Sequence, residues 1–219
     1  MSIALFDLDN TLLGGDSDYE WGQFLVERGV VDPVAYKAAN ERFYKQYSDG
    51  ELDIYEFARF AFQPLKENSM AQLEQWRETF INQRIQPMML PKGRAKIEWH
   101  QQRGDTVAII TATNRFVTEP IAQKFGIEHL LATEPEVLAG VFTGEISGIP
   151  CFQQGKVERL NAWLKEKNYN LDKSWFYSDS HNDLPLLEQV SNPYAVDPDD
   201  TLRRIAQERN WNIATFRNG

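Results

Sequence analysis

Short apolar runs alternate along this chain with longer segments in which apolar residues recur every three or four positions. Such runs are typical of buried parallel strands, and such segments are typical of amphipathic helices. The pattern predicts strands at 3–6, 106–112, 130–133, 174–179, 194–197 and 212–216. It predicts helices at 94–102, 116–125, 155–166 and 201–209. This alternation indicates an α/β fold built on a doubly wound parallel sheet.

Residues 15–85 lack strand-like runs and carry aromatic residues at helical spacing. Turn and cap signals at 16–18, 32–33 and 48–50 divide this segment, so we expect about three to five helices. Its aromatic side chains are expected to pack mainly against one another, with one or two left to line a pocket. The chain is therefore divided into a catalytic core, residues 1–14 and 86–219, and a helical cap, residues 15–85.

A second departure from the alternation lies at residues 136–150. Three turn-favouring pairs separate short β-type runs there, namely Ala139-Gly140, Thr143-Gly144 and Ser147-Gly148. Such pairs are typical of hairpin turns. We expect a short antiparallel flap in this region.

Composition narrows the class of protein. A formal net charge of -9 at pH 7 argues against a nucleic-acid or anionic-membrane surface, because either needs a basic patch. The single Cys151 permits no intrachain disulfide, which suits a reducing cytoplasm. There is no leader-like start and no apolar run of the ~20 residues that span a bilayer. We expect a soluble cytoplasmic protein that acts on a small molecule, and no pattern predicts its oligomeric state.

The predicted strands end in chemically active residues. Asp7 and Asp9 follow the first strand, Thr111 ends the second, Asp179 ends the fourth, and Lys156 begins a helix. The carboxyl ends of parallel strands share one edge of a sheet, where such folds hold their ligands. Two carboxylates so close repel unless a cation or a shared proton intervenes. The set fits a site for Mg²⁺ and a phosphoryl group.

Each residue also has a structural interpretation. Asp9 would cap the next helix, Thr111 would close a strand, and Lys156 would be a solvated helix charge. Asp179 and Asp183 would cap the helix at Leu184. Their joint order along the chain favours the functional interpretation.

Four motifs carry a resemblance to a known family. They are Asp7-Leu8-Asp9-Asn10-Thr11, Ile109-Ile110-Thr111, Lys156, and Ser178-Asp179-Ser180-His181-Asn182-Asp183-Leu184-Pro185. In type and order they resemble the motifs of the haloacid dehalogenase-like hydrolase superfamily. A helical cap after the first motif is similar to the phosphoserine phosphatase branch, subfamily IB, and to its subgroup in which histidinol phosphatases occur. The resemblance implies a Rossmann-like hydrolase core.

The resemblance also implies roles for individual residues. Asp7 would be the nucleophile that forms an aspartyl-phosphate, and Asp9 the general acid and base. The metal Mg²⁺ would be held by Asp7, Asp179 and the backbone carbonyl of Asp9. The phosphate-binding residues would be Thr111, Ala112, Lys156 and Leu8, with Asp183 and Asn182 in support. Dehalogenases of this superfamily lack the second acid and transport ATPases carry Thr there, so Asp9 indicates a phosphatase or phosphotransferase.

The substrate is less sharply indicated. In the phosphoserine phosphatase pattern an acid nine residues after the nucleophile contacts the substrate amine, and Asp16 holds that position. A helix cap is the equal alternative for Asp16. Arg42 and Arg59 are candidates for reading a substrate carboxylate. Without such an Arg, an amino-alcohol phosphate such as histidinol phosphate fits better than phosphoserine. A receiver-like signalling module is a more distant alternative, and it lacks both the insert and the second acid.

Overall fold

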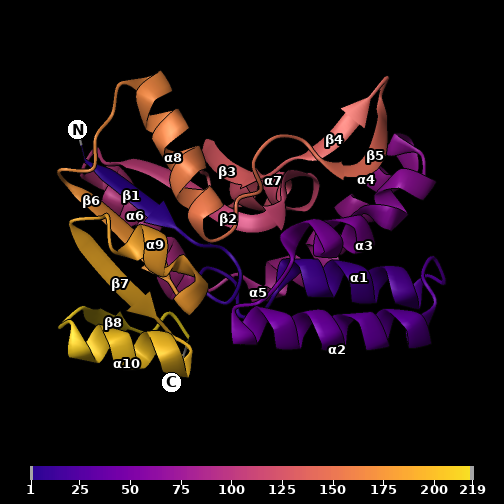
Figure 1. Ribbon diagram of the computed structural model, residues 1–219. Coiled ribbons are helices and arrows are strands. Elements are labelled where there is room, and N and C mark those ends of the chain that lie inside the picture. Colours follow the sequence, from indigo (N-terminus) through magenta and orange to yellow (C-terminus); the bar gives the residue numbers. More distant parts are fainter. Residues whose placement is uncertain (1, 218–219) are drawn as a thin grey trace.

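The computed structural model describes residues 2–217 of the 219-residue chain. Its centre is a six-stranded sheet in which all neighbouring strands are parallel, in the order β3-β2-β1-β6-β7-β8 (Figure 1). The strands are β1 (Ile3–Phe6), β2 (Thr106–Asn114), β3 (His129–Thr133), β6 (Ser174–Ser178), β7 (Asn192–Val196) and β8 (Asn212–Ala214). β1 is wholly buried between β2 and β6. The predicted doubly wound sheet is confirmed, and β1 brings Asp7 to the middle of its carboxyl edge.

Helices cover both faces of the sheet. α6 (Pro91–Gln102) and α7 (Arg115–Lys124) pack on one face, and α8 (Gln154–Lys167), α9 (Leu184–Leu187) and α10 (Asp200–Glu208) pack on the other. Alternate residues of β1 enter the two apolar layers, with Phe6 in the first and Leu5 in the second. This alternation follows from the two-residue period of a strand. The chain is therefore a three-layer α/β/α structure.

The segment after β1 is helical. It comprises α1 (Ser17–Glu27), α2 (Pro33–Asp49), α3 (Ile54–Glu67), α4 (Met70–Phe80), a π-helical turn η1 (Ile81–Ile85) and α5 (Gln86–Met88). Its aromatic residues pack together as expected, and Trp21 lies 5.2 Å from Phe80 and 6.0 Å from Phe116 of α7 between ring centroids. The apolar core therefore runs without interruption from the sheet into the insert. The division into core and cap remains a prediction.

Two linkers join the insert to the sheet. Leu13 and Met89 form an antiparallel bridge, and the Gly14 N–H donates to the Met88 carbonyl at 2.8 Å. The Leu90 N–H donates to the Leu12 carbonyl at 3.0 Å. The segment that enters the insert and the segment that leaves it are thus joined by backbone hydrogen bonds into a short two-stranded ribbon.

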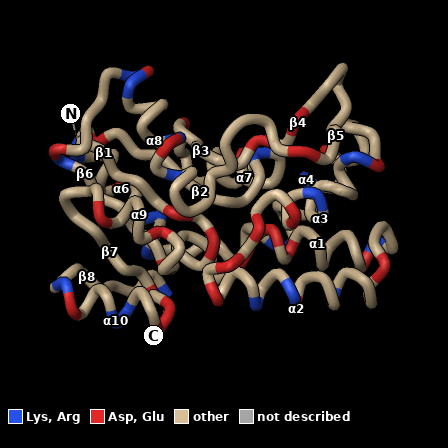
Figure 2. The backbone as a smooth tube through the Cα atoms, viewed as in Figure 1, with Lys and Arg blue, Asp and Glu red and all other residues tan. Residues whose placement is uncertain are grey.

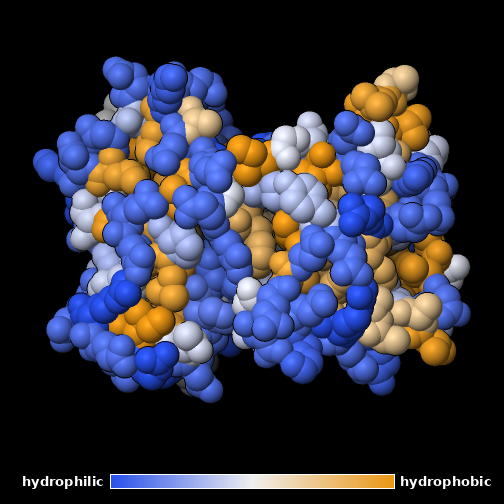
Figure 3. All heavy atoms as spheres, in the orientation of Figure 1, coloured by the Kyte–Doolittle hydropathy of each residue, from blue (hydrophilic) through white to orange (hydrophobic). Residues whose placement is uncertain are grey.

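The flap is a single hairpin of β4 (Pro135–Leu138) and β5 (Val141–Ile146), packed against α3 (Figure 1). Its turn is Ala139-Gly140, and both residues have positive φ. The turn expected at Thr143-Gly144 is wrong, because both residues lie inside β5. There Gly144 has a φ of +90° and a Cβ would sit 3.1 Å from the Lys66 side chain. Apolar residues gather at the tip of the flap (Figure 3), where Leu138 is 61% exposed.

No helix in residues 2–217 has both the length and the apolar character needed to cross a bilayer.

Candidate active site

A buried ion-pair network lies at the carboxyl edge of the sheet. The Lys156 Nζ, from the first turn of α8, donates to Asp7 Oδ1 at 2.8 Å. The same ammonium lies 2.7 Å from Oδ1 of Asp183, in the 3₁₀ turn η2 (His181–Asp183). Lys156 is only 3% exposed, so its interpretation as a solvated helix charge is wrong. A buried ammonium is stable here because two carboxylates pair with it.

Asp183 supports this lysine rather than a helix. Its Oδ2 accepts a hydrogen bond from the Ser178 hydroxyl at 2.6 Å and another from Lys156 at 2.9 Å. Its side chain makes no capping hydrogen bond to α9. The alternative in which Asp183 caps the helix at Leu184 is therefore wrong.

Asp9 is held between two elements that are distant in sequence. The Ser17 N–H, at the start of α1, donates to Asp9 Oδ1 at 2.6 Å. The Thr113 hydroxyl, near the end of β2, donates to Asp9 Oδ2 at 2.8 Å. The contact of Thr113 with Asp9 depends on how β2 and the β1–α1 connection meet. Both oxygens of Asp9 are thus fixed beside Asp7.

Asp179 follows β6 at the same edge. The buried Thr11 hydroxyl donates to Asp179 Oδ1 at 3.2 Å, which ties the first motif to the fourth. The neighbouring strands β1 and β6 pair Phe6 with Tyr177, so Asp7 and Asp179 leave adjacent strands within one residue of the same height. The sequence predicted that both acids lie at one edge of the sheet, and the strand order places them on adjacent strands.

Burial and mutual repulsion raise the pKa values of the carboxyl groups at this edge of the sheet. Burial raises the pKa of Asp7 to about 7, with Asp183 and Asp9 raising it further and Lys156 opposing them. Burial and the Asp16 carboxylate raise the pKa of Asp9 to about 7, although Ser17 and Thr113 donate to it. Burial, Asp7 and Asp183 raise the pKa of Asp179 well above its usual range. A single ammonium therefore leaves the cluster short of positive charge, which a divalent cation or bound protons would supply.

The donor set fits a metal held by few side chains. No group of three or more His, Cys, Asp or Glu side chains in residues 2–217 is arranged to hold a metal ion. The predicted ligands need only two carboxylates, Asp7 and Asp179, because the third is the backbone carbonyl of Asp9. Hard oxygen donors with uncompensated negative charge are the chemistry that Mg²⁺ prefers, with water in its other positions. The residues present therefore fit this metal.

The predicted phosphate-binding residues surround the same edge. Thr111 is buried in β2, where its hydroxyl accepts the Thr113 N–H at 3.2 Å, and the strand continues to Asn114. Ala112 is partly exposed beside it. Leu8 is wholly buried in the apolar core, so its side chain does not face a ligand. Thr111 thus lies inside β2 and not at its end, so the interpretation in which it only ends the strand is wrong.

The end of α2 docks on the loop that carries Asp179. The Tyr47 hydroxyl donates to Ser180 Oγ at 2.8 Å, and Asn182 Nδ2 donates to the Tyr47 carbonyl at 3.2 Å. Gln153 Nε2 donates to Asn182 Oδ1 at 2.9 Å. Asn182 thus joins two core loops to the insert. Sequence reasoning missed Tyr47, because one tyrosine in an aromatic helix looks like any other packing residue.

Asp16 caps α1, since its Oδ1 accepts the N–H groups of Asp18 and Tyr19 at 2.9 Å each. It is nevertheless exposed toward solvent, so its remaining oxygen is not committed by the cap. Arg42 pairs with Glu56 and Arg59 with Glu145 on the surface, at 2.7 and 3.7 Å. Neither arginine contacts the acids at the sheet edge. A helix cap at Asp16 does not prevent contact with a ligand.

Two of the three histidines have polar partners within the protein. His100 is wholly buried and contacts Asp105 at 2.7 Å and the Tyr177 hydroxyl at 2.9 Å. His181 Nδ1 lies 2.8 Å from Asp199 Oδ2, at the margin of the fourth motif.

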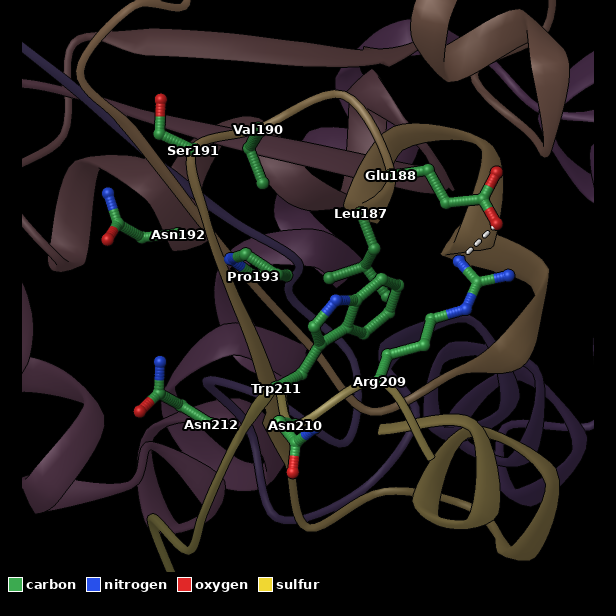
Figure 4. Close-up of a pocket in the computed structure, with 10 residues that line it drawn as sticks. All are labelled: Leu187, Glu188, Val190, Ser191, Asn192, Pro193, Arg209, Asn210, Trp211 and Asn212. Carbon is green, nitrogen blue, oxygen red and sulfur yellow. Dashed lines mark hydrogen bonds and ion pairs between the residues drawn. The ribbon is translucent and has the colours of Figure 1, made fainter. Parts of the chain in front are cut away.

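A cavity of about 510 Å³ lies at the amino ends of β7 and β8 (Figure 4). Its charged residues, Glu188 and Arg209, pair with each other, so it carries none of the candidate chemistry.

The family model of haloacid dehalogenase-like hydrolases matches residues 4–188. This match covers most of the chain. The chain belongs to the haloacid dehalogenase-like hydrolase family. The matched residues include every motif residue from Asp7 to Asp183, and the receiver-like alternative is therefore excluded.

Two relatives of this hydrolase are named as phosphatases. It is 41% identical over 220 residues to a histidinol-phosphatase of Neisseria meningitidis, with 99% of each chain covered. It is 31% identical to a phosphoserine phosphatase of Mycobacterium tuberculosis, over 99% of this chain and 71% of the relative. The family and these relatives identify the protein as a phosphatase.

Solved structures agree on the fold of the hydrolase. A Bordetella pertussis protein of unknown function aligns over 99% of both chains, with a TM-score of 0.93 and 43% identity. A phosphoserine phosphatase with an analogue of its phospho-aspartyl intermediate aligns over 99% of this chain and 93% of the other. That pair has a TM-score of 0.71 and 19% identity, so it supports the fold alone.

Proposed function

We propose that this phosphatase is a Mg²⁺-dependent hydrolase of a small amino-alcohol phosphate, with histidinol phosphate as its substrate, and that it acts through an aspartyl-phosphate on Asp7. The observation that carries the proposal is the buried contact of Lys156 with Asp7, beside an Asp9 whose two oxygens are both held in place. This arrangement places a nucleophile (Asp7), a positive charge (Lys156) and a proton-transfer group (Asp9) close together at the carboxyl edge of the sheet.

The nucleophilic step begins at Asp7. Its carboxylate attacks phosphorus in line with the leaving alcohol, and the P–O ester bond breaks as the Asp7 O–P bond forms. Repulsion between the carboxylate and a phosphate dianion opposes this approach. Lys156 offsets that repulsion from 2.8 Å away. Asp7 and Asp179 would hold Mg²⁺, which would supply further positive charge to the phosphate oxygens.

Proton transfer is assigned to Asp9. The pKa of Asp9, raised to about 7 by burial and by Asp16, suits a group that is protonated for one step and ionised for the next. Protonated Asp9 donates to the leaving alkoxide. Ionised Asp9 then accepts a proton from the water that attacks the aspartyl-phosphate, which releases phosphate and restores Asp7.

We assign the binding of the phosphate oxygens to four groups, namely the Lys156 ammonium, the Thr111 hydroxyl, and the backbone N–H groups of Leu8 and Ala112. Asp183 keeps Lys156 in place, and Asn182 orients the loop of Asp179. These groups position the substrate without reacting, which is how most phosphoryl-transfer sites work.

Histidinol phosphate is favoured over phosphoserine by two observations. The Neisseria relative that covers 99% of both chains carries the name histidinol-phosphatase. Phosphoserine has a carboxylate that needs a cationic partner, whereas Arg42 and Arg59 are engaged in surface ion pairs. Asp16 would take the substrate amine. Phosphoserine remains the second candidate because the Mycobacterium relative is named a phosphoserine phosphatase.

The test is Mg²⁺-dependent phosphate release from histidinol phosphate, phosphoserine, sugar phosphates and nucleotides, with Asp7→Asn as the blank. We expect histidinol phosphate to have the highest kcat/KM and EDTA to abolish release. A higher value for phosphoserine would replace the substrate assignment. Transfer to an added alcohol that outpaces release to water would make the protein a phosphotransferase.

A further inference from the structure

A row of carboxylates runs from the sheet edge into the helical insert. Asp9 raises the pKa of Asp7, Asp16 raises that of Asp9, and both Asp9 and Asp16 raise that of Asp18. Acidic residues are seen gathered where the sheet meets α1 (Figure 2). Within residues 2–217, no Lys or Arg forms an ion pair with Asp9, Asp16 or Asp18. The mechanism uses Asp7 and Asp9, and Asp16 caps α1, but Asp18 has no role so far.

Asp18 lies close enough to Asp9 for the Asp9 carboxylate to raise its pKa. Asn114 Nδ2, at the end of β2, donates to Asp18 Oδ1 at 3.2 Å. Asn114 directly follows Thr113, which holds Asp9, and it is buried. Asp18 is only partly exposed, and Oδ2 accepts no hydrogen bond from residues 2–217. One oxygen of Asp18 is thus fixed, and the other is available to a ligand.

A glycine opens space beside Asp18. Gly22 lies one turn further along α1, and a Cβ at this position would sit 1.3 Å from the Tyr36 hydroxyl of α2. Glycine inside a helix is destabilising relative to alanine. That cost lets the Tyr36 hydroxyl lie against α1, close enough to Asp18 and Asp16 for both carboxylates to raise its pKa. Tyr36 is held there by stacking on Phe60, with ring centroids 5.3 Å apart.

The hydroxyl of Ser17, the residue between Asp16 and Asp18 in the sequence, is unpaired. Ser17 is wholly buried, and its Oγ has no hydrogen-bond partner in residues 2–217. Its hydroxyl nevertheless lies close enough to the Asp9 carboxylate to lower the pKa of that group. A buried hydroxyl without a partner is destabilising, because it has lost its hydrogen bonds to water. Such an atom beside the acid row is expected where a ligand completes the hydrogen bonding.

We infer that Asp18, with Asn114 and the Tyr36 hydroxyl, is the specificity site for the end of the substrate farthest from the phosphate, and that it binds a nitrogen base that donates N–H or carries positive charge. This inference rests on the proposed function, in which the phosphate end of the substrate reacts at Asp7 and Asp9. A nitrogen base neutralises the acid row, whereas a carboxylate placed there would be repelled by it. In histidinol phosphate this group is the imidazole, and Asp16 remains free for the amine.

The test compares substrates that differ at this end. Histidinol phosphate carries both amine and imidazole, phosphoethanolamine carries the amine alone, and p-nitrophenyl phosphate carries neither. We expect Asp18→Asn to lower the ratio of kcat/KM for histidinol phosphate over phosphoethanolamine at least tenfold, mainly through KM. Asn keeps the acceptor for Asn114, so this variant should fold. Tyr36→Phe should lower the same ratio by a smaller factor.

Two further measurements make the outcome decisive. Glu41→Gln removes an equal charge from an exposed site on α2 and should leave the ratio unchanged. Calorimetric binding of histidinol itself, without phosphate, should weaken at least tenfold in Asp18→Asn. An unchanged ratio and unchanged histidinol binding would overturn the inference while leaving the phosphatase proposal intact. Phosphate release from none of the three esters would overturn the proposed function, and histidinol binding would then decide on Asp18 alone.

Discussion

Lys156→Met tests the buried charge network most severely. Methionine keeps the length and most of the volume of the side chain, so the change removes charge with little cavity. The ammonium lies 2.8 Å from Asp7 Oδ1 and 2.7 Å from Asp183 Oδ1. At an effective dielectric of about 20, each unit-charge pair at ~4 Å between charge centres is worth ~4 kcal/mol. Breaking such a buried pair costs about 3–5 kcal/mol, because the carboxylates stay buried and unpaired.

The assay is thermal and urea unfolding at pH 7 in EDTA. For a chain of this size, that loss corresponds to a fall in Tm of roughly 6 to 20 °C. Stability should recover partly toward pH 5, since protonation of the carboxylates removes the unpaired charge. Lys165→Met, on the exposed face of the same helix, is the matched control and should leave the Tm unchanged. A Tm within about 2 °C of wild type for Lys156→Met would refute the argument.

Three more predictions concern pH, docking and packing. The pKa of Asp9, raised by burial and Asp16 to about 7, means that the folded protein holds a proton which the unfolded chain loses near pH 4. Metal-free wild type should therefore lose stability relative to Asp9→Asn between about pH 4 and 7 in urea unfolding, and a pH-independent difference would contradict this. Tyr47→Phe removes the hydrogen bond to Ser180 and should cost about 1 kcal/mol; amide exchange in residues 180–182 should speed up, and unchanged exchange would argue against docking. Gly22→Ala forces Tyr36 out of place and should cost about 1–3 kcal/mol, whereas relief of a helical glycine alone would stabilise the protein.

Much of the core was predictable because its signals are local. The apolar run 3–6 before Asp7 predicted the central strand, and the other predicted sheet strands lie within a few residues of those observed. The prediction of a turn at Thr143-Gly144 was wrong. Gly144 lies inside a strand, where the absence of a Cβ lets the Lys66 side chain pack closely against the backbone. Such an approach joins segments far apart in the chain and leaves no local trace.

The candidate site shows the same division. Motif order placed Asp7, Lys156 and Asp183 at one edge, and the structure brings them into contact. The contacts of Asp9 with Thr113 and Ser17 were not predictable, since they depend on how the insert meets β2. Asp18 looked like one more residue of a helix start, because nothing in the sequence signals that Asn114 lies beside it.

Nucleophilic attack by Asp7 is the central claim. Asp7→Asn should lose at least roughly 10³ in turnover, about 4 kcal/mol of barrier. The most direct measurement is an acid quench of Asp9→Asn during turnover of ³²P-labelled p-nitrophenyl phosphate, followed by peptide mapping. This ester has a leaving group that needs no proton, while water attack lacks its base, so the aspartyl-phosphate should accumulate. The account predicts label on the peptide that contains Asp7 and none in the Asp7→Asn/Asp9→Asn double variant; label on another residue, or turnover without any labelled protein, would contradict it.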